Sequence, residues 1–170
     1  MDKFFVKLAN DESTYKKVVE YMKKTDADYD IPMSMRVNIG DYVKKIISKA
    51  VTIAVMENDE IIGMANFYCN DMETKTCYIT NVSISKKAQE KGYHLNDFVH
   101  AILIIAQKVG MKRLRAETTD RRVLILHKRL GAVEFKREEI NGVIHYHSYL
   151  EDIDGWLKKD SARRITVLNL

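Results

Sequence analysis

The sequence has no apolar run near the roughly 20 residues that a membrane-spanning helix needs, and it has no large excess of either charge. Its 170 residues carry a formal net charge of only +4. Lysines and arginines are interleaved with acids, so no basic tail or stripe indicates nucleic-acid binding. The start, Met1-Asp2-Lys3, has no apolar segment typical of a secretory signal. We therefore expect a cytoplasmic protein that binds neither nucleic acid nor a membrane.

Cysteine is also scarce, since the chain has only 2. Cys69 and Cys77 lie at equal distances on either side of Glu73. If this region is a hairpin, the two thiols face each other across it at a distance that a disulfide could bridge. In a reducing cytoplasm, two buried free thiols are the expected state.

The chain lacks internal repeats, low-complexity stretches and a recognisable linker. Its 170 residues are enough for one well-packed domain and few for two. We expect a single domain over residues 1–158. Residues 159–170 form a C-terminal extension, whose apolar end could pair with a sheet edge or contact a second copy in a homodimer.

Hydrophobic periodicity changes several times along the chain, which indicates alternating strands and helices. Helical spacing predicts a helix that follows Asp11 and ends near Lys24, and further helices over residues 42–47, 95–109 and 120–131. Period-two patterns predict strands over residues 4–8, 51–56, 61–69, 76–84, 113–118, 133–140 and 143–150. The pair Asn141-Gly142 is a strong signal for a hairpin between the last two strands.

This order of elements predicts the fold class. A meander of strands is followed by helix, strand, helix and hairpin. We therefore expect an α/β (α+β) domain with a mixed, mostly antiparallel central sheet of about seven strands, flanked by about four helices.

The segment from Ile84 to His94 is the most informative stretch. An apolar strand ends at Ile84, a polar turn follows, and Gly92 stands just before the pattern of a long helix. The first N–H groups of a helix have no partner within the helix and lie at the positive end of its dipole. A phosphate at that position gains hydrogen bonds and charge stabilisation. The turn is therefore a candidate diphosphate site.

The turn and a second motif together resemble the GNAT superfamily of acyl-CoA-dependent N-acetyltransferases. The family's first motif, Arg or Gln, two residues, Gly, one residue, then Gly or Ala, is matched here by Gln89-x-x-Gly92-x-His94. The resemblance extends from about Val51 to Arg137. The second motif is matched by Asp120-x-x-Val123-Leu124-x-Leu126-His127-x-Arg129-Leu130-Gly131.

The resemblance implies acetyl-CoA as cosubstrate. Backbone amides of the turn would hold the pyrophosphate of coenzyme A, and the end of the preceding strand would run beside its pantetheine. An unpaired N–H on that strand could polarise the thioester oxygen. The residues implied in cofactor binding are Val82, Ser83, Ile84, Gln89, Glu90, Lys91, Gly92, Tyr93, His94, Asp120 and Arg122.

Three positions depart from the family pattern. His94 stands where the family prefers Gly or Ala, so its side chain must point away from the phosphates or donate to them. Tyr78 stands where the strand before the turn often carries a catalytic carboxylate. His127 replaces the usual Tyr of the second motif. No carboxylate base can therefore be carried over from the family.

Four side chains are candidates for the chemistry. His127 could protonate the departing thiolate, or be a surface histidine at a helix end. Tyr78 could orient the acceptor, or be a core tyrosine. His145 and His147 share one strand face, and either could receive the amine proton. They could instead face solvent or ligate zinc, but no further Cys or acid cluster completes a metal set, so we assign none.

An acidic segment, Asp26-Ala27-Asp28-Tyr29-Asp30, precedes these motifs. Its alternating acids are similar to the start of a calcium loop, but Ile31 and Val37 stand where that loop needs Gly and Glu. The acids are either a solvated turn or a feature that attracts a cationic amine.

We therefore predict an N-acetyltransferase that moves an acetyl group from acetyl-CoA to a primary amine of a small molecule, by direct attack in a ternary complex. The acceptor could be an amino sugar, an amino acid or a polyamine. Neither cysteine lies at a motif position, so no covalent intermediate is expected. The alternatives are a CoA-binding regulatory protein with a decayed active site, and an acetyltransferase of protein lysines or N-termini.

Overall fold

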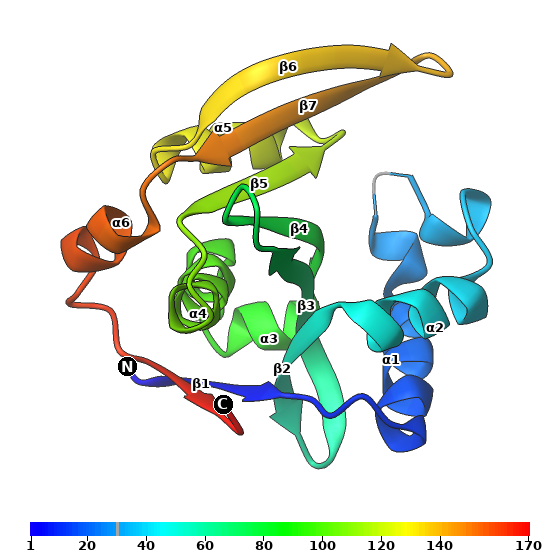
Figure 1. Ribbon diagram of the computed structural model, residues 1–170. Helices are drawn as coiled ribbons and strands as arrows, with labels where there is room; N and C mark the ends of the chain where they lie inside the picture. Colours follow the sequence, from blue (N-terminus) through cyan, green and yellow to red (C-terminus); the bar gives the residue numbers. More distant parts are fainter. Residues whose placement is uncertain (30) are drawn as a thin grey trace.

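The computed structural model describes residues 1–29 and 31–170 and contains one mixed sheet (Figure 1). In the described residues the sheet has 8 strands in the order β6-β7-β5-β4-β3-β2-β1-β8. Only the β4–β5 and β1–β8 pairs are parallel. The strands are β1 (Lys3–Lys7), β2 (Val51–Glu57), β3 (Glu60–Asp71), β4 (Thr76–Ile84), β5 (Arg113–Thr118), β6 (Val133–Ile140), β7 (Val143–Leu150) and β8 (Ile165–Leu168).

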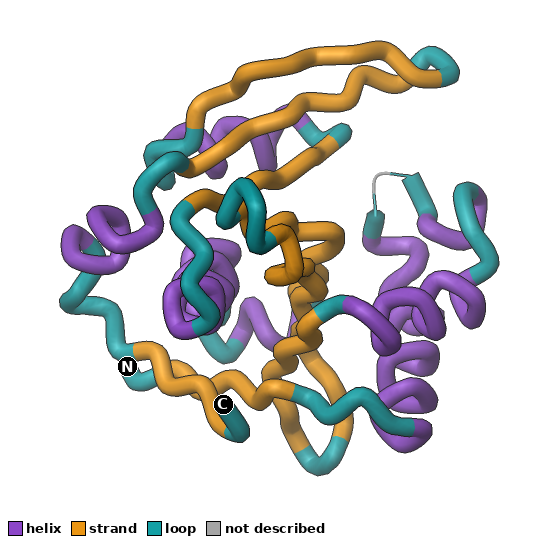
Figure 2. Tube along the Cα trace, viewed as in Figure 1, coloured by secondary structure: helices purple, strands orange, loops and turns teal. Residues whose placement is uncertain are grey.

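Helices cover both faces of the sheet (Figure 2). The helices α1 and α2 pack on one face, while α4 packs on the other and α5 lies against β5, β6 and β7. No described helix is both long and apolar enough to cross a membrane. The α-helices are α1 (Glu12–Thr25), α2 (Ile39–Lys49), α3 (Lys86–Glu90), α4 (Leu95–Lys108), α5 (Arg121–Arg129) and α6 (Ile153–Lys159), and two 3-10 turns, η1 (Asp26–Asp28) and η2 (Met33–Met35), lie between α1 and α2.

The helices α1 and α5 begin after the capping residues that the sequence indicated. The carboxylate of Asp11 accepts the backbone N–H of Thr14 at 2.8 Å, and Asp120 accepts that of Arg122 at the start of α5. Such caps satisfy N–H groups that have no partner inside the helix. The expected Asn141-Gly142 hairpin turn is also confirmed, because Gly142 has a φ of 78° between β6 and β7.

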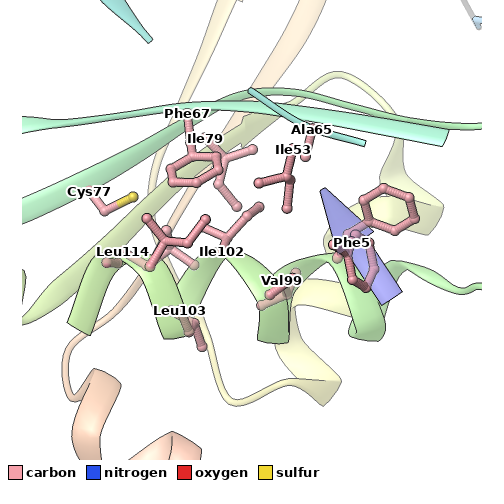
Figure 3. Close-up of a cluster of buried hydrophobic side chains, with 14 of the residues drawn as sticks. Phe5, Ile53, Ala65, Phe67, Cys77, Ile79, Val99, Ile102, Leu103 and Leu114 are labelled. Atoms are coloured by element: carbon pink, nitrogen blue, oxygen red, sulfur yellow. The ribbon is translucent and has the colours of Figure 1, made fainter. Parts of the chain in front are cut away.

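The main core lies between the sheet and α4 (Figure 3). Phe98 on α4 and Phe5 on β1 are both fully buried and meet edge to face, with ring centroids 4.9 Å apart. Ile102 packs in the same cluster beneath Phe67 of β3. A second cluster fills the space between α1, α2 and the other sheet face. Burial on both faces explains why β2 and β3 are almost continuously apolar.

The structure adds one strand and two short helices to the expected elements. The sheet has an eighth strand, because β8 pairs in parallel with β1 from Lys3↔Ile165 to Val6↔Leu168. The apolar end of the chain therefore pairs with an edge of its own sheet. The short helices α3 and α6 were not expected. They have 5 and 7 residues, which is too short to show a helical repeat of apolar residues in the sequence.

The two thiols face each other as expected. Cys69 on β3 and Cys77 on β4 are free, and their Sγ atoms lie 3.3 Å apart. Cys77 is buried, but Cys69 is only half-buried, so the expectation of two buried thiols is wrong for Cys69.

Candidate active site

A cleft opens where β4 and β5 diverge. The two strands pair in parallel from Thr76↔Arg113 to Ile79↔Ala116, and no further. Beyond that point β4 stays paired with β3, and β5 stays paired with β7 as far as Thr118. The facing edges of β4 and β5 therefore keep free backbone groups on either side of a cleft of about 560 Å³. Of the residues expected beside the pantetheine, Val82 and Ile84 line this cleft, whereas Ser83 does not.

A β-bulge lies on β4 at the point of divergence. Asn81 pairs with Asn66 of β3, whereas Ile79 pairs with Phe67, so Thr80 is the extra residue. A bulge bends the strand and disturbs the alternation of its side chains. The side chains of Thr80 and Asn81 consequently both turn toward α1 and α2.

Three tyrosines from the helical segment hold this stretch of β4 in place. Each hydroxyl forms a hydrogen bond to a different residue of the strand. The bonds are Tyr42 Oη to Thr80 Oγ1 (3.0 Å), Tyr29 Oη to Asn81 Oδ1 (3.2 Å) and Tyr21 Oη to the Ser83 carbonyl (3.0 Å). Burial raises the pKa of Tyr29 and Tyr42, so both hydroxyls stay protonated at neutral pH. Sequence reasoning missed these contacts, because they join residues 38 to 62 positions apart in the chain.

The turn after β4 is closed by its own hydrogen bonds. The side-chain amide of Gln89 donates to the carbonyl of Ile84 at 3.0 Å. The backbone N–H groups of Gly92 and Tyr93 donate to Gln89 and Ala88. Gly92 has a φ of 79°, which favours glycine at this position. These amides are therefore not free, in contrast to the row of open donors expected from the sequence.

The backbone N–H groups that have no partner among the described residues lie just after this turn, at the start of α4. The N–H of His94 donates to the Asp97 carboxylate at 2.8 Å, and the N–H of Asp97 donates to the His94 carbonyl. Within the described part of the chain, the amides of Leu95 and Asn96 have no partner. Leu95 also lines the cleft. The cleft therefore reaches the first residue of α4, at the positive end of a helix whose first two N–H groups are free among the described residues.

Several predicted cofactor residues make other contacts. The ammonium of Lys91 pairs with Glu57 at 2.5 Å, and the exposed Glu90 has no role that the structure supports. The ring of Tyr93 packs edge to face on Phe5. At the start of α5, Arg122 pairs with the Asp120 carboxylate at 2.6 Å, and Asp120 lines the cleft.

His127 is buried and borders the cleft from α5. The alternative of a surface histidine is therefore wrong. Its Nδ1 lies 3.1 Å from the hydroxyl of Ser148, and burial lowers the pKa of the imidazole. The ring is therefore neutral at neutral pH. Among the described residues, every buried side-chain nitrogen and oxygen has a hydrogen-bond partner. No partner is found there for Nε2 of His127, so this atom is not fully buried.

Tyr78 faces the cleft from the opposite side of the sheet and contacts a carboxylate that sequence reasoning missed. Its hydroxyl donates to Glu117 on β5 at 3.3 Å, and Glu117 also contacts the Nδ1 of His145. Burial, followed by the nearby Glu117 charge, raises the pKa of Tyr78 to about 12. The alternative of a core tyrosine is wrong, since Tyr78 is only half-buried. Glu117 and Tyr78 both line the cleft.

His147 lies behind this group. Its Nε2 is 2.9 Å from Glu138 on β6, and its Nδ1 is 4.0 Å from Glu117. His145 and His147 thus share one strand face, as predicted, and both contact acids. In the described residues no group of three or more His, Cys, Asp and Glu side chains is arranged to hold a metal ion. The acid at position 30 of the earlier acidic segment, Asp30, lies outside the described residues.

The alternation of Leu114 and Ala116 with polar residues was the signal that could have revealed Glu117. On a strand with one buried face, this alternation places Arg115 and Glu117 on the opposite face. The sequence could not show that this face borders a cleft. That depends on β4 and β5 diverging after Ala116.

Comparison with solved structures finds the same fold in acetyltransferases. The GNAT-family acetyltransferase of Streptococcus pneumoniae is 14% identical, with a TM-score of 0.63 over 86% of this chain and 96% of that one. Aminoglycoside 6'-acetyltransferase type Ii is 9% identical, with a TM-score of 0.68 over 88% and 96%. A GNAT-family acetyltransferase of Elizabethkingia anophelis with acetyl-CoA bound is 17% identical, with a TM-score of 0.53 over 65% and 82%.

Comparisons by sequence add nothing further. No protein-family model matches the chain, and no curated protein matches its sequence. The structural likeness, at 9% to 17% identity, establishes the fold. The chain therefore has the fold of the GNAT acetyltransferases, as its motifs predicted.

Proposed function

We propose that the protein transfers an acetyl group from acetyl-CoA to a primary amine of a small molecule, by direct attack within a ternary complex. The observation that carries this proposal is the cleft between β4 and β5. It reaches Leu95, the first residue of α4, at one end and a carboxylate and a tyrosine at the other. A likeness to acetyltransferases, one of them with acetyl-CoA bound, supports the same assignment.

The residues along the cleft fit the parts of coenzyme A. The amides of Leu95 and Asn96 suit a diphosphate, because they offer N–H groups at a helix N-terminus. Val82, Ile84 and Leu95 give the cleft an apolar wall. The unpaired backbone edge of β4 can bond the amides of a pantetheine. When bound, acetyl-CoA supplies the activated acetyl group and a thiolate leaving group.

Glu117 is the candidate general base. An amine must lose its proton before it can attack a thioester, and Glu117 is the carboxylate that faces the cleft beside Tyr78. The Tyr78 hydroxyl and His145 each contact one oxygen of this carboxylate and so hold its orientation. A proton on Glu117 can leave through His147 and Glu138 to the exposed β6–β7 hairpin.

His127 acts on the other side of the sheet. If the Ser148 hydroxyl donates to Nδ1, the proton of the neutral ring sits on Nε2, which has no other partner. Nε2 can then donate a hydrogen bond to the departing sulfur. The predicted roles of Tyr78 and His127 are kept, and Glu117 takes the role of base that no sequence motif supplied. His147 moves from direct contact to the proton path.

Two measurements test the proposal. Calorimetry with acetyl-CoA measures cofactor binding, and the release of free thiol in the presence of a panel of primary amines measures turnover. We expect binding, and thiol release that depends on the amine. Binding without turnover of any amine would favour the regulatory alternative, whereas no binding of acetyl-CoA would reject both.

Glu117→Gln tests the assignment of the base. The amide keeps the shape of the side chain but cannot accept the proton, so kcat should fall by about a hundredfold. Affinity for acetyl-CoA should remain, because Glu117 lies at the acceptor end of the cleft. The matched control is Glu139→Gln, which changes an exposed acid on β6 outside the cleft. An unchanged kcat and pH profile in Glu117→Gln would remove this residue from the mechanism.

A further inference from the structure

The acceptor end of the cleft has one basic side chain. Among the described residues that line the cleft, Arg36 is the only Lys or Arg. It follows η2 directly, in the segment that carries Tyr29 and Tyr42. Those tyrosines bond to Thr80 and Asn81 on the α1–α2 face of the sheet. Arg36 therefore stands on the acceptor side, across the sheet from His127 and α5.

The guanidinium of Arg36 has no partner among the residues that the structure describes. Within the described residues it has no ion pair and no hydrogen bond from its side chain. One acid that feels the charge of Arg36, Asp26, is held by Ser34, whose backbone N–H and hydroxyl both donate to that carboxylate. Burial raises the pKa of Tyr42, and the charge of Arg36 opposes that rise. The charge of Arg36 thus limits the rise in the pKa of the Tyr42 hydroxyl that bonds to Thr80. The guanidinium itself remains available to a ligand.

The other walls of the acceptor end carry acidic and apolar side chains. Glu117 supplies a negative charge next to Tyr78. Met33 and Tyr42 line the same cleft. The hydroxyls of Tyr42 and Tyr78 already have partners, so these residues offer mainly their rings. The cleft thus has a cationic group, an anionic group and apolar surface.

We infer that the acceptor is an amino carboxylate with an apolar or aromatic body, whose carboxylate binds Arg36 while its amine is directed to Glu117. Arginine suits this role because its planar guanidinium donates two parallel hydrogen bonds to a carboxylate. This inference rests on the proposed function, because it names the substrate class of the same cleft. It selects amino acids from the acceptors that the sequence left open.

One residue favours a different class of acceptor. Asp28 also lines the cleft and is exposed, so a second amine could bind there. A diamine would then be preferred over an amino carboxylate. Asp28 and Arg36 are both exposed, so solvent screens the charge of each, whereas the Glu117 side chain is only 31% exposed and is fixed by two partners. The comparison of the two classes is therefore built into the test.

The test measures kcat/KM for pairs of acceptors that differ only in the carboxylate. Suitable pairs are phenylalanine with phenethylamine, and 6-aminohexanoate with hexylamine, with cadaverine as the diamine. Hydrogen bonds to a charged group are worth enough to change binding by about ten- to hundredfold. We expect kcat/KM for the better amino carboxylate of the panel to exceed kcat/KM for its partner amine, and for cadaverine, by at least about tenfold.

Variants assign the effect to Arg36. Arg36→Met should abolish the preference for the carboxylate, so that the two members of each pair have similar kcat/KM values. Arg36→Lys keeps the charge and should retain part of the preference. The control, Lys44→Met, removes an exposed cation of α2 outside the cleft and should leave the preference intact.

The outcomes separate this inference from the proposed function. Turnover that is faster with plain amines or with cadaverine overturns the inference and keeps the acetyltransferase. A preference for the carboxylate that survives in Arg36→Met also overturns it. Binding of acetyl-CoA with no turnover of any amine rejects the proposed function instead.

Discussion

Removing the cation of Arg163 is expected to destabilise the protein and weaken acetyl-CoA binding. Arg163 lies after α6, and its Nη1 is 2.7 Å from the carboxylate of Asp97 at the start of α4. The same carboxylate caps the helix by accepting the N–H of His94. Asp97 is thus a negative charge next to the amides of Leu95 and Asn96, where we propose that a diphosphate binds.

The magnitude follows from burial. The Asp97 side chain is 4% exposed, and that of Arg163 is 30% exposed. Breaking a fully buried ion pair costs about 3–5 kcal/mol, because one charge is left buried without its partner. The partial exposure of Arg163 and the favourable helix dipole at Asp97 reduce that cost. For Arg163→Met we therefore expect a loss of about 2 kcal/mol in the free energy of unfolding.

Chemical denaturation measures the loss, and calorimetry with acetyl-CoA measures the change in affinity. The matched control is Arg164→Met, because Arg164 is 80% exposed and pairs only loosely with Asp2 at 3.6 Å. The control should change stability by less than about 0.5 kcal/mol. Its affinity for acetyl-CoA should match that of the unaltered protein.

A double variant decides whether the uncompensated charge is the cause. Asp97→Asn removes that charge and keeps an oxygen that can accept the N–H of His94. Asp97→Asn combined with Arg163→Met should therefore be more stable than Arg163→Met alone. Equal losses in Arg163→Met and Arg164→Met, or no rescue by Asp97→Asn, would refute this reasoning.

Two further predictions concern buried side chains. Burial lowers the pKa of His127 below 6.5, so the unfolded state binds more protons between that lowered pKa and 6.5. The free energy of unfolding should fall as the pH is lowered through this window, and His127→Gln should flatten that part of a denaturation series against pH. Phe98→Ala should cost about 3–5 kcal/mol in denaturant unfolding, because the ring is fully buried against Phe5. The exposed control Phe135→Ala should cost under about 1 kcal/mol, and equal losses would contradict the packing argument.

The sequence predicted the local elements because their causes are local. Hydrophobic period, caps such as Asp11 and Asp120, and the Asn141-Gly142 turn depend on residues a few positions apart. The seven expected strands are all present. The helix α3 has 5 residues, which is too short for a periodic signal.

The turn after β4 shows the limit of a motif. Gln89 and Gly92 were correctly expected in a turn before a long helix, because a glycine with positive φ fits that geometry. Their order in the chain could not show that the turn satisfies its own amides. Nor could it show that Asp97 takes the N–H of His94, or that Arg163, 66 residues later, pairs with Asp97.

The sequence by itself determined most of the helices and strands, and where a glycine turn stands before a long helix. Only the tertiary structure decided that Glu117 joins Tyr78, His145 and the cleft, and that Arg36 stands at the same end. The physical reason is that strand pairing sets these contacts. β4 and β5 are parallel neighbours that separate after Ile79 and Ala116, and no local pattern in either strand specifies where its partner departs.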